Sequence, residues 1–276
     1  MTGLVLVLVA VFVTQPSTTS AATKPRKLPG LQVHQVVPPD PATLRALTLA
    51  SGQAADWVAK QVSPAAVISC DPAMCAVLKA HGVPAAQLQV NANANPADAA
   101  VVVATPGVRG QLGTRLTSVY APELIASFGA DPARIDVRAA TPGIGPSYPT
   151  AVVADRADRI SAGQQLLRNK RIGVSHAARA ALTAGDVDPR LLVMISALAA
   201  RQRLNIVSFG DPSPGAPDVP LRSAVVGVGK PAKLVTFLRG QRPPYRPDQV
   251  LIVRIARGQR GLSIEFDAPG PLGLGG

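Results

Sequence analysis

Side chains that commonly carry catalysis are few in this sequence, and their spacing favours structural roles. The chain holds three histidines and no Gly-x-Ser-x-Gly motif. Ser175 and His176 are adjacent, and neighbouring residues on a helix do not face each other, so we predict that Ser175 caps a helix. The Gly-Val-Gly-Lys segment at 227–230 is similar to part of a phosphate-binding loop. Pro231 stands where that loop requires Ser or Thr, so we predict a strand-to-helix turn there.

The acidic residues offer no clear pair for acid–base chemistry. Asp155 and Asp158 fall on one face of a predicted helix, next to Arg156 and Arg159. Charges of mixed sign on one helix face are typical of a solvated surface, which is the interpretation we adopt. We therefore predict no catalytic residue, no metal site and no cofactor in this chain.

The chain has two cysteines, and their position bears on its compartment. Cys70 and Cys75 lie on either side of an Asp71-Pro72 pair that is typical of a helix start. Their spacing predicts either a small disulfide, as exported proteins form, or two buried free thiols. A disulfide across so short a loop contributes about 2 kcal/mol. A zinc site that adds His81 lacks a fourth ligand, which argues against it.

One proline-rich segment carries an aromatic side chain between two cations. Tyr245 lies between Arg242 and Arg246 in the sequence Arg-Pro-Pro-Tyr-Arg-Pro, and we expect this segment to be extended. Arg242, Tyr245 and Arg246 are therefore candidates for contact with an anion or a partner. A plain surface loop is the alternative.

Positive charge is concentrated in the second half of the chain. Residues 140–276 hold 18 basic and 9 acidic side chains, whereas residues 1–139 hold 10 and 7. Such a surface attracts anions at low salt. For an exported protein we expect anionic lipid headgroups or wall polymers as partners. Nucleic acid, the partner expected in the cytoplasm, is disfavoured by two aspartates in the helix-turn-helix-like segment 174–203. Arginine as a mere solubilising residue of a GC-rich genome is the alternative.

The N-terminal segment predicts export. Leu4–Val13 is an unbroken apolar run, shorter than the roughly 20 residues that span a bilayer as a helix. Its length matches the core of a signal peptide, and small residues at 20–22 fit a cleavage site. Signal peptides usually carry basic residues before the apolar run, and none stands there. One alternative is that the true translation start lies further upstream, so that the run is part of a longer membrane segment. Another is that the run forms a buried strand. We predict a signal peptide or membrane anchor over residues 1–22, a linker over 23–42, and an extracytoplasmic protein that is membrane-anchored or secreted.

Helix and strand patterns alternate over residues 43–140, which predicts a small α/β sandwich with a largely parallel sheet. The expected helices are 44–58 and 72–81, and the expected strands are 66–70, 88–90, 99–104, 125–128 and 134–138.

A Pro- and Gly-rich boundary at 141–149 separates this module from a second, basic α+β module predicted over residues 150–268. The expected helices are 151–167, one ending before Gly185, 189–202 and 232–239, and the expected strands are 204–209, 225–226, 250–255 and 262–266.

Several short motifs accumulate along the first module. They are Ala-Ala-Asp-Trp-Val at 54–58, a strand ending in Asp71, Val101–Pro106, Ser-Phe-Gly at 127–129 and Arg134–Arg138. Residues 54–139 resemble the soluble, outward-facing C-terminal module of actinobacterial membrane glycosyltransferases of the protein-mannosyltransferase-like class. The resemblance implies an α/β fold, an extracytoplasmic location and a membrane glycosyltransferase as partner. That family's catalytic acidic loop lies in a multi-helix membrane domain with no counterpart here, so the resemblance implies no catalytic residue.

These features together predict a non-catalytic binding or accessory protein of the actinobacterial cell envelope. One alternative is an exported hydrolase with a site between the two modules, which histidines and carboxylates clustered near residues 210–220 would favour. A second alternative is a basic nucleic-acid-binding protein.

Overall fold

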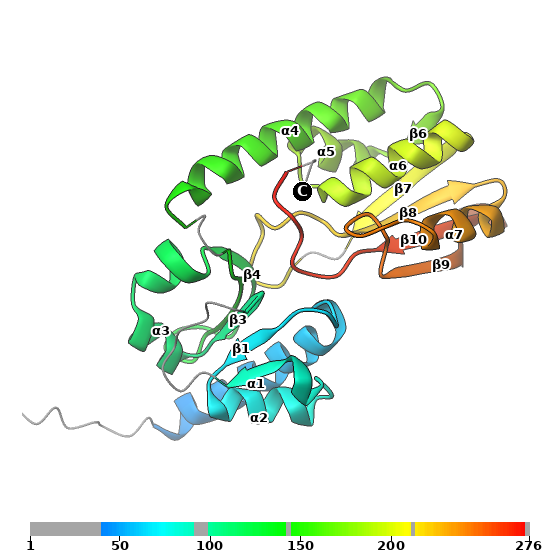
Figure 1. The fold of residues 1–276 in the computed structure, drawn as a ribbon. Coiled ribbons are helices and arrows are strands. Elements are labelled where there is room, and N and C mark those ends of the chain that lie inside the picture. Colours follow the sequence, from blue (N-terminus) through cyan, green and yellow to red (C-terminus); the bar gives the residue numbers. More distant parts are fainter. Residues whose placement is uncertain (1–39, 91–98, 142–144, 211–212, 274–276) are drawn as a thin grey trace, which may run out of the picture. The chain divides into compact units, whose positions relative to one another are not determined.

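Two five-stranded sheets with their helices make up the described part of the chain (Figure 1). The structure is a computed structural model and describes residues 40–90, 99–141, 145–210 and 213–273. The predicted signal peptide or anchor over 1–22, and the linker as far as residue 39, lie outside the described residues. Helix α1 begins at Pro41, within the last two residues of the predicted linker.

The first sheet has the strand order β2-β1-β3-β5-β4. Its strands are β1 (Ile68–Cys70), β2 (Leu88–Val90), β3 (Val101–Ala104), β4 (Glu123–Phe128) and β5 (Ile135–Ala139). Strand β1 pairs parallel with β2 and β3, whereas β5 pairs antiparallel with β3 and β4. The predicted α/β class is confirmed. Strands β2, β1 and β3 form a parallel part of the sheet, and the β4–β5 hairpin pairs antiparallel with its edge at β3.

Strand β3 is covered on both faces, as its uniform Val/Ala sequence predicts. Val101 and Val103 belong to the core shared with helices α1 (Pro41–Gln61) and α2 (Pro72–Ala80). Val102 and Ala104 pack on the other side with Val108 of helix α3 (Pro106–Leu112). Alternate side chains of one strand therefore enter two layers.

The helices of this half begin at matched signals in the sequence. Asp40, Asp71 and Thr105 each precede a proline at the first helical position, and each side chain accepts hydrogen bonds from backbone amides of the first turn. Asp71 therefore caps α2 as predicted. Helix α3 was not expected from the sequence, because its 7 residues are too few to show helical periodicity.

The second sheet has the strand order β6-β7-β8-β10-β9. Its strands are β6 (Ile172–Val174), β7 (Leu204–Gly210), β8 (Ser223–Val228), β9 (Gln249–Arg254) and β10 (Arg260–Glu265). Its helices are α4 (Tyr148–Arg168), α5 (His176–Ala184), α6 (Pro189–Arg201) and α7 (Pro231–Arg239). Only β6 and β7 pair in parallel, and the other neighbours are antiparallel. Strand β6 is the one strand here that the sequence did not predict.

Two predicted local structures of this half are confirmed. The Ser175 hydroxyl accepts a hydrogen bond from the Ala178 amide and so caps α5. The segment 227–230 comprises the end of β8 and the two-residue turn that leads into α7. Gly163 of α4 lies so close to the Leu182 backbone of α5 that a Cβ would clash. Helices α4 and α5 are therefore in backbone contact.

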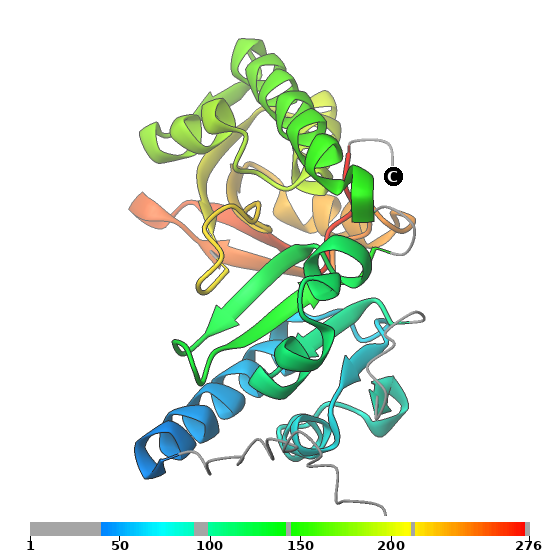
Figure 2. The ribbon, with the colours of Figure 1, turned by 90° about the vertical axis from the view of Figure 1, so that its left-hand side faces the viewer.

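Backbone hydrogen bonds link the two halves of the described chain within the compact unit Pro39–Gly276. The Ala268 amide donates to the carbonyl oxygen of Gln61 at 2.7 Å, and the Ser63 amide donates to Ala268 at 2.9 Å. The Ser127 amide of β4 donates to the carbonyl oxygen of Pro214 at 2.7 Å, where the 213–220 segment runs beside β4 (Figure 2). Among the described residues, no helix has both the length and the apolar character to cross a membrane.

Candidate functional site

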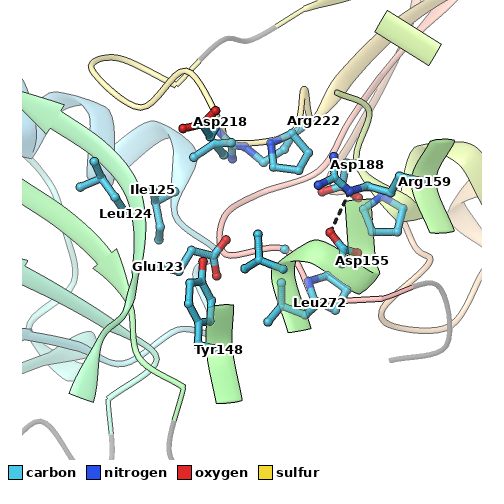
Figure 3. Close-up of a pocket in the computed structure, with 16 residues that line it drawn as sticks. Glu123, Leu124, Ile125, Tyr148, Asp155, Arg159, Asp188, Asp218, Arg222 and Leu272 are labelled. Carbon is cyan, nitrogen blue, oxygen red and sulfur yellow. Dashed lines mark hydrogen bonds and ion pairs between the residues drawn. The ribbon is translucent and has the colours of Figure 1, made fainter. Parts of the chain in front are cut away.

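A pocket of about 220 Å³ lies between β4, the first half of α4 and the 218–222 segment (Figure 3). It is lined by Glu123, Leu124, Ile125, Tyr148, Val152, Asp155, Arg159, Asp188, Pro189, Asp218, Val219, Pro220, Arg222, Gly270, Pro271 and Leu272. Most of the apolar lining is aliphatic or proline. Four of the lining residues carry carboxyl groups, namely Glu123, Asp155, Asp188 and Asp218. The chemistry of the pocket therefore depends on which of these carboxyl groups are charged and which are paired.

Glu123 is the carboxyl group without a partner. It is the first residue of β4 and half-buried, and Figure 3 shows its carboxyl group pointing into the pocket beside the Tyr148 ring. Among the described residues it makes no hydrogen bond or ion pair. Burial, with a smaller contribution from the charges of Asp155 and Asp188, raises the pKa of Glu123 to about 7, and the positive charge of Arg159 offsets part of this effect. Glu123 therefore changes its protonation near neutral pH.

Tyr148, the first residue of α4, lies next to Glu123 in the pocket. Burial raises the pKa of Tyr148, and the negative charge of Glu123 adds to the effect. The phenol is therefore neutral at every physiological pH. It can donate one hydrogen bond and accept others.

Asp155 is held by an arginine on the next turn of α4. Its Oδ2 lies 2.8 Å from Nε of Arg159, and the two side chains are 6% and 5% exposed. Asp155 also accepts a hydrogen bond from the Gly273 amide at 2.8 Å, and Arg159 donates to the carbonyl oxygen of Gly185. The prediction of a solvated face is wrong for these two residues, because the turn before α6 and the C-terminal segment cover that side of the helix.

The rest of the predicted face of α4 is solvated. Asp158 is exposed, and exposed Arg156 lies 3.5 Å from Asp186. Surface pairs of this kind contribute little to stability. The face therefore divides into a buried ion pair that builds the pocket and an exposed part that does not.

Asp188 is neutralised in the same way. Its carboxylate caps α6 through the Arg190 amide at 2.8 Å and binds the Arg190 guanidinium through two bonds, at 3.0 and 2.8 Å. Arg190 also donates to the carbonyl oxygen of Asp267 and lies over the Phe266 ring. Such a two-bond arrangement fixes both side chains and leaves no net charge.

Arg222 forms the cationic part of the wall. Only 2% of it is exposed, and its guanidinium donates to the backbone and side-chain oxygens of Gln61 at 3.3 and 3.1 Å. It lies 5.5 Å from the centre of the Trp57 ring. Asp218 is exposed at the rim of the pocket. Beside the Asp155–Arg159 ion pair and the carboxylate of Asp188, the site thus combines the buried guanidinium of Arg222, the rim carboxylate of Asp218 and the titrating Glu123.

This arrangement can bind hydrogen-bonding groups, and Glu123 can donate or accept a proton near pH 7. The described residues contain no group of three or more histidine, cysteine or acidic side chains placed to hold a metal ion. Among the residues that the structure describes, neither histidine nor cysteine lines the pocket. Its chemistry therefore centres on one carboxyl group and one phenol.

The residues singled out from the sequence lie elsewhere. Cys70 and Cys75 form a disulfide that joins the end of β1 to the first turn of α2. The segment around Tyr245 is a turn, closed by a hydrogen bond from the Tyr245 amide to Arg242 at 2.9 Å, and not the extended segment predicted. The Tyr245 side chain is half-buried against the second core, while Arg242 and Arg246 are exposed. The contact of these three residues with an anion or a partner stays a prediction.

The sequence did not single out Glu123, Tyr148 or Asp218. One signal was present, because Glu123 is the only acidic residue between 99 and 130 and stands at the start of an apolar strand. Tyr148 falls in the predicted boundary 141–149, and Asp218 in a turn-rich loop. Comparison with protein-family models, with curated proteins and with solved structures finds no match. The resemblance to the glycosyltransferase module therefore stays a prediction.

Proposed function

We propose that this protein is a non-catalytic binding protein of the cell envelope that holds a small ligand in the Glu123 pocket. The observation that carries the proposal is the difference between the carboxyl groups. Asp155 and Asp188 are each bound to an arginine, whereas Glu123 has no hydrogen-bond partner among the described residues. Leaving a carboxyl group unpaired in a pocket costs stability, and such a cost is typical of a functional site.

The lining defines the chemistry of the ligand. Glu123 offers carboxylate oxygens that accept hydrogen bonds, and the Tyr148 hydroxyl lies beside it. Leu124, Val152 and Leu272 supply apolar contact. The volume, about 220 Å³, is below the 300–1,000 Å³ of sites for drug-sized molecules. The ligand we expect is small and carries a protonated amine or another hydrogen-bond donor.

Two features support the proposed extracytoplasmic location. The apolar run Leu4–Val13 matches a signal-peptide core. The Cys70–Cys75 disulfide is a bond that persists in oxidising, extracytoplasmic compartments. Anionic lipids or wall polymers, and a membrane glycosyltransferase, are the partners that this location and the resemblance suggest.

A carboxylate-dependent hydrolase is the second candidate. It is favoured by two carboxyl groups of one pocket that form no ion pair with any described residue, because Glu123 has a pKa of about 7 while Asp218 is exposed at the rim. Carboxyl groups in unlike environments divide the roles of acid and base in many hydrolases. Against it, the carboxylates of Asp155 and Asp188 are bound to arginine, and the described lining of the pocket contains no histidine.

Ligand-observed NMR on the full chain tests the proposal. The probes are the amino acids together with glucosamine and glucose, a pair of sugars that differ in one amino group. We expect amine-bearing probes to bind the wild type, with affinity rising between pH 5 and pH 8 as Glu123 ionises. Glu123→Gln should weaken that binding roughly tenfold or more, as expected for a lost bond to a charged group.

The matched control is Asp158→Asn, which removes an exposed carboxylate of α4 outside the pocket. It should leave probe binding unchanged. Equal binding of probes to the wild type and to Glu123→Gln would remove the pocket from consideration. Release of nitrophenol from nitrophenyl esters or glycosides by the wild type and not by Glu123→Gln would favour the hydrolase instead.

A further inference from the structure

Six exposed cations gather at one edge of the second sheet. They are Arg201, Arg203, Lys230, Lys233, Arg254 and Arg260, and we name this set the basic edge. None of them lines the Glu123 pocket. The basic edge is therefore a feature separate from the site described above.

The topology of the sheet brings these side chains together. Strand β8 runs antiparallel to β7 and β10, and β10 runs antiparallel to β9. The start of β7, the end of β8, the start of β10 and the end of β9 therefore share one edge. Arg203, Lys230, Arg260 and Arg254 lie at these four positions. Arg201 ends α6 and Lys233 lies in the first turn of α7, which adjoin the same edge.

Two hollows are open at this edge. One, of about 490 Å³, has Arg203 and Arg260 in its lining, and the other, of about 500 Å³, has Arg201, Lys230 and Lys233. Gly229 lines both, and a Cβ placed on it would meet nothing within 4 Å. None of the described residues that line the two hollows is acidic. The space beside these cations is thus open and free of negative charge.

The cations repel one another without compensation. Arg254 and Arg260 are directly opposite across the β9–β10 ladder, an arrangement of like charges that destabilises a sheet. In the described part of the chain, no carboxylate lies within ion-pair distance of any member of the basic edge. Elsewhere the same structure pairs arginines with aspartates, as at Arg159 and Arg190. An external anion would relieve the repulsion.

Further donors face the second hollow. Arg201 is held flat against the Phe237 ring, 3.8 Å from its centre, which limits the motion of the guanidinium. Gln202 lines the hollow, and its buried Nε2 amide has no hydrogen-bond partner among the described residues. No side chain caps the amino end of α7, which begins beside Lys230. These groups all donate hydrogen bonds, which suits an oxyanion with several acceptor oxygens.

We propose that the basic edge binds phosphate groups. Anionic lipid headgroups and free phosphate are the two sources of this chemistry. Nucleic acid is a different partner and is disfavoured, because the described lining of the two hollows holds no aromatic side chain that could stack on a base. The basic edge is thus a second binding site, separate from the Glu123 pocket, through which the second half of the chain contacts phosphate groups.

Vesicle flotation with the full chain tests the site. The wild type should float with vesicles of phosphatidylcholine and phosphatidylglycerol at low salt, and less with phosphatidylcholine alone. The variant Arg203→Gln, Lys230→Gln, Lys233→Gln should lower partition into the anionic vesicles roughly a hundredfold, since each basic side chain near such a surface contributes about a fivefold factor. Higher salt should lower the wild-type partition as well.

The control variant is Arg45→Gln, Lys60→Gln, Lys79→Gln. It removes the same charge from exposed positions on α1 and α2, so the net charge of the two variants is equal. It should lower partition only a few fold. Equal loss in both variants would show a net-charge effect and overturn the proposal. Flotation of the wild type that is strong and equal with neutral and anionic vesicles would show binding that does not depend on phosphate charge, and would overturn it too.

A calorimetric titration with inorganic phosphate distinguishes free phosphate from lipid headgroups as the ligand of the basic edge. Heat of binding in the wild type that is lost in the basic-edge variant and kept in the control supports a site that also takes free phosphate. Vesicle binding without phosphate binding supports a site for lipid headgroups. Tighter binding of duplex DNA than of anionic vesicles, with the same sensitivity to the variant, would overturn the proposal in favour of nucleic acid. Absence of binding to both anionic vesicles and phosphate would also overturn it.

Discussion

Replacement of Glu123 by glutamine is expected to make the protein more stable at high pH and not at low pH. The ordinary pKa of a glutamate is 4.5, and in the folded protein that of Glu123 is about 7. Between these two values the folded protein retains a proton that the unfolded chain has released. Stability therefore falls as pH rises through this window. Glutamine has no proton to lose, so the variant lacks this part of the pH dependence.

The pKa shift sets the size of the effect. One pKa unit corresponds to about 1.36 kcal/mol, so the full shift corresponds to about 3 kcal/mol. Glu123 is half-buried at the mouth of the pocket, and water screening reduces the penalty to about 1–2 kcal/mol. We therefore expect Glu123→Gln to exceed the wild type by about 1–2 kcal/mol at pH 8 and to match it at pH 4, where both side chains are neutral.

Urea unfolding at pH 4 and pH 8 measures the difference. Burial also raises the pKa of Asp267, to about 6, but Asp267 titrates in both proteins, and its effect cancels in the difference. Asp218→Asn, at the exposed rim of the same pocket, is the control and should show a difference that does not change with pH. A constant offset between Glu123→Gln and the wild type across this range would refute the reasoning, because it would mean that Glu123 titrates normally.

Three further substitutions test the surroundings of the site. Asp155→Ala leaves Arg159 buried without its carboxylate, and should lower the free energy of unfolding by about 3–5 kcal/mol in urea titrations. The double variant Cys70→Ser, Cys75→Ser should lose about 2 kcal/mol by the same measurement, because a short closed loop restricts the unfolded chain only modestly. Gly163→Ala should cost about 1–3 kcal/mol and lower the melting temperature, because the new methyl group meets the backbone of α5.

Each of these has a matched control. Asp158→Ala removes an exposed carboxylate of the same helix and should change stability by less than about 0.5 kcal/mol. Gly110→Ala places a methyl group of α3 where nothing lies within 4 Å and should not destabilise the fold. Thiol reduction should lower the stability of the wild type to that of the double serine variant and leave the variant unchanged. A loss for Gly110→Ala equal to that for Gly163→Ala would contradict the steric argument.

Local structure in this protein follows closely from the sequence. Asp71-Pro72 marks the start of α2, Ser175 caps α5, and the Val/Ala run at 99–104 becomes a strand covered on both faces. The two caps depend on hydrogen bonds within a few residues of chain, and the strand depends on an unbroken apolar run that fits a site covered on both faces. The sequence therefore states them directly, and the α/β class follows from their alternation.

The burial of charged residues is what the local sequence pattern predicted wrongly. Asp155 and Arg159 have the spacing of a surface pair on α4, and only the turn before α6 and the C-terminal segment, far along the chain, cover them. Periodicity shows which residues share a helix face, but it does not show what packs against that face. A charged pair that neutralises itself can be buried where an isolated charge would not be.

The pocket itself is a product of tertiary structure alone. Glu123, Tyr148 and Asp218 come from the start of a strand, the start of a helix and a loop, separated by 25 and 70 residues. The raised pKa of Glu123 arises from the burial of its carboxyl group and from carboxylates on other elements. The sequence by itself determined the α/β class and most of the elements, with helix α3 and strand β6 as the exceptions. The packing of those elements decided which side chains share a cavity, because a solvent-excluded environment exists only after distant segments have met.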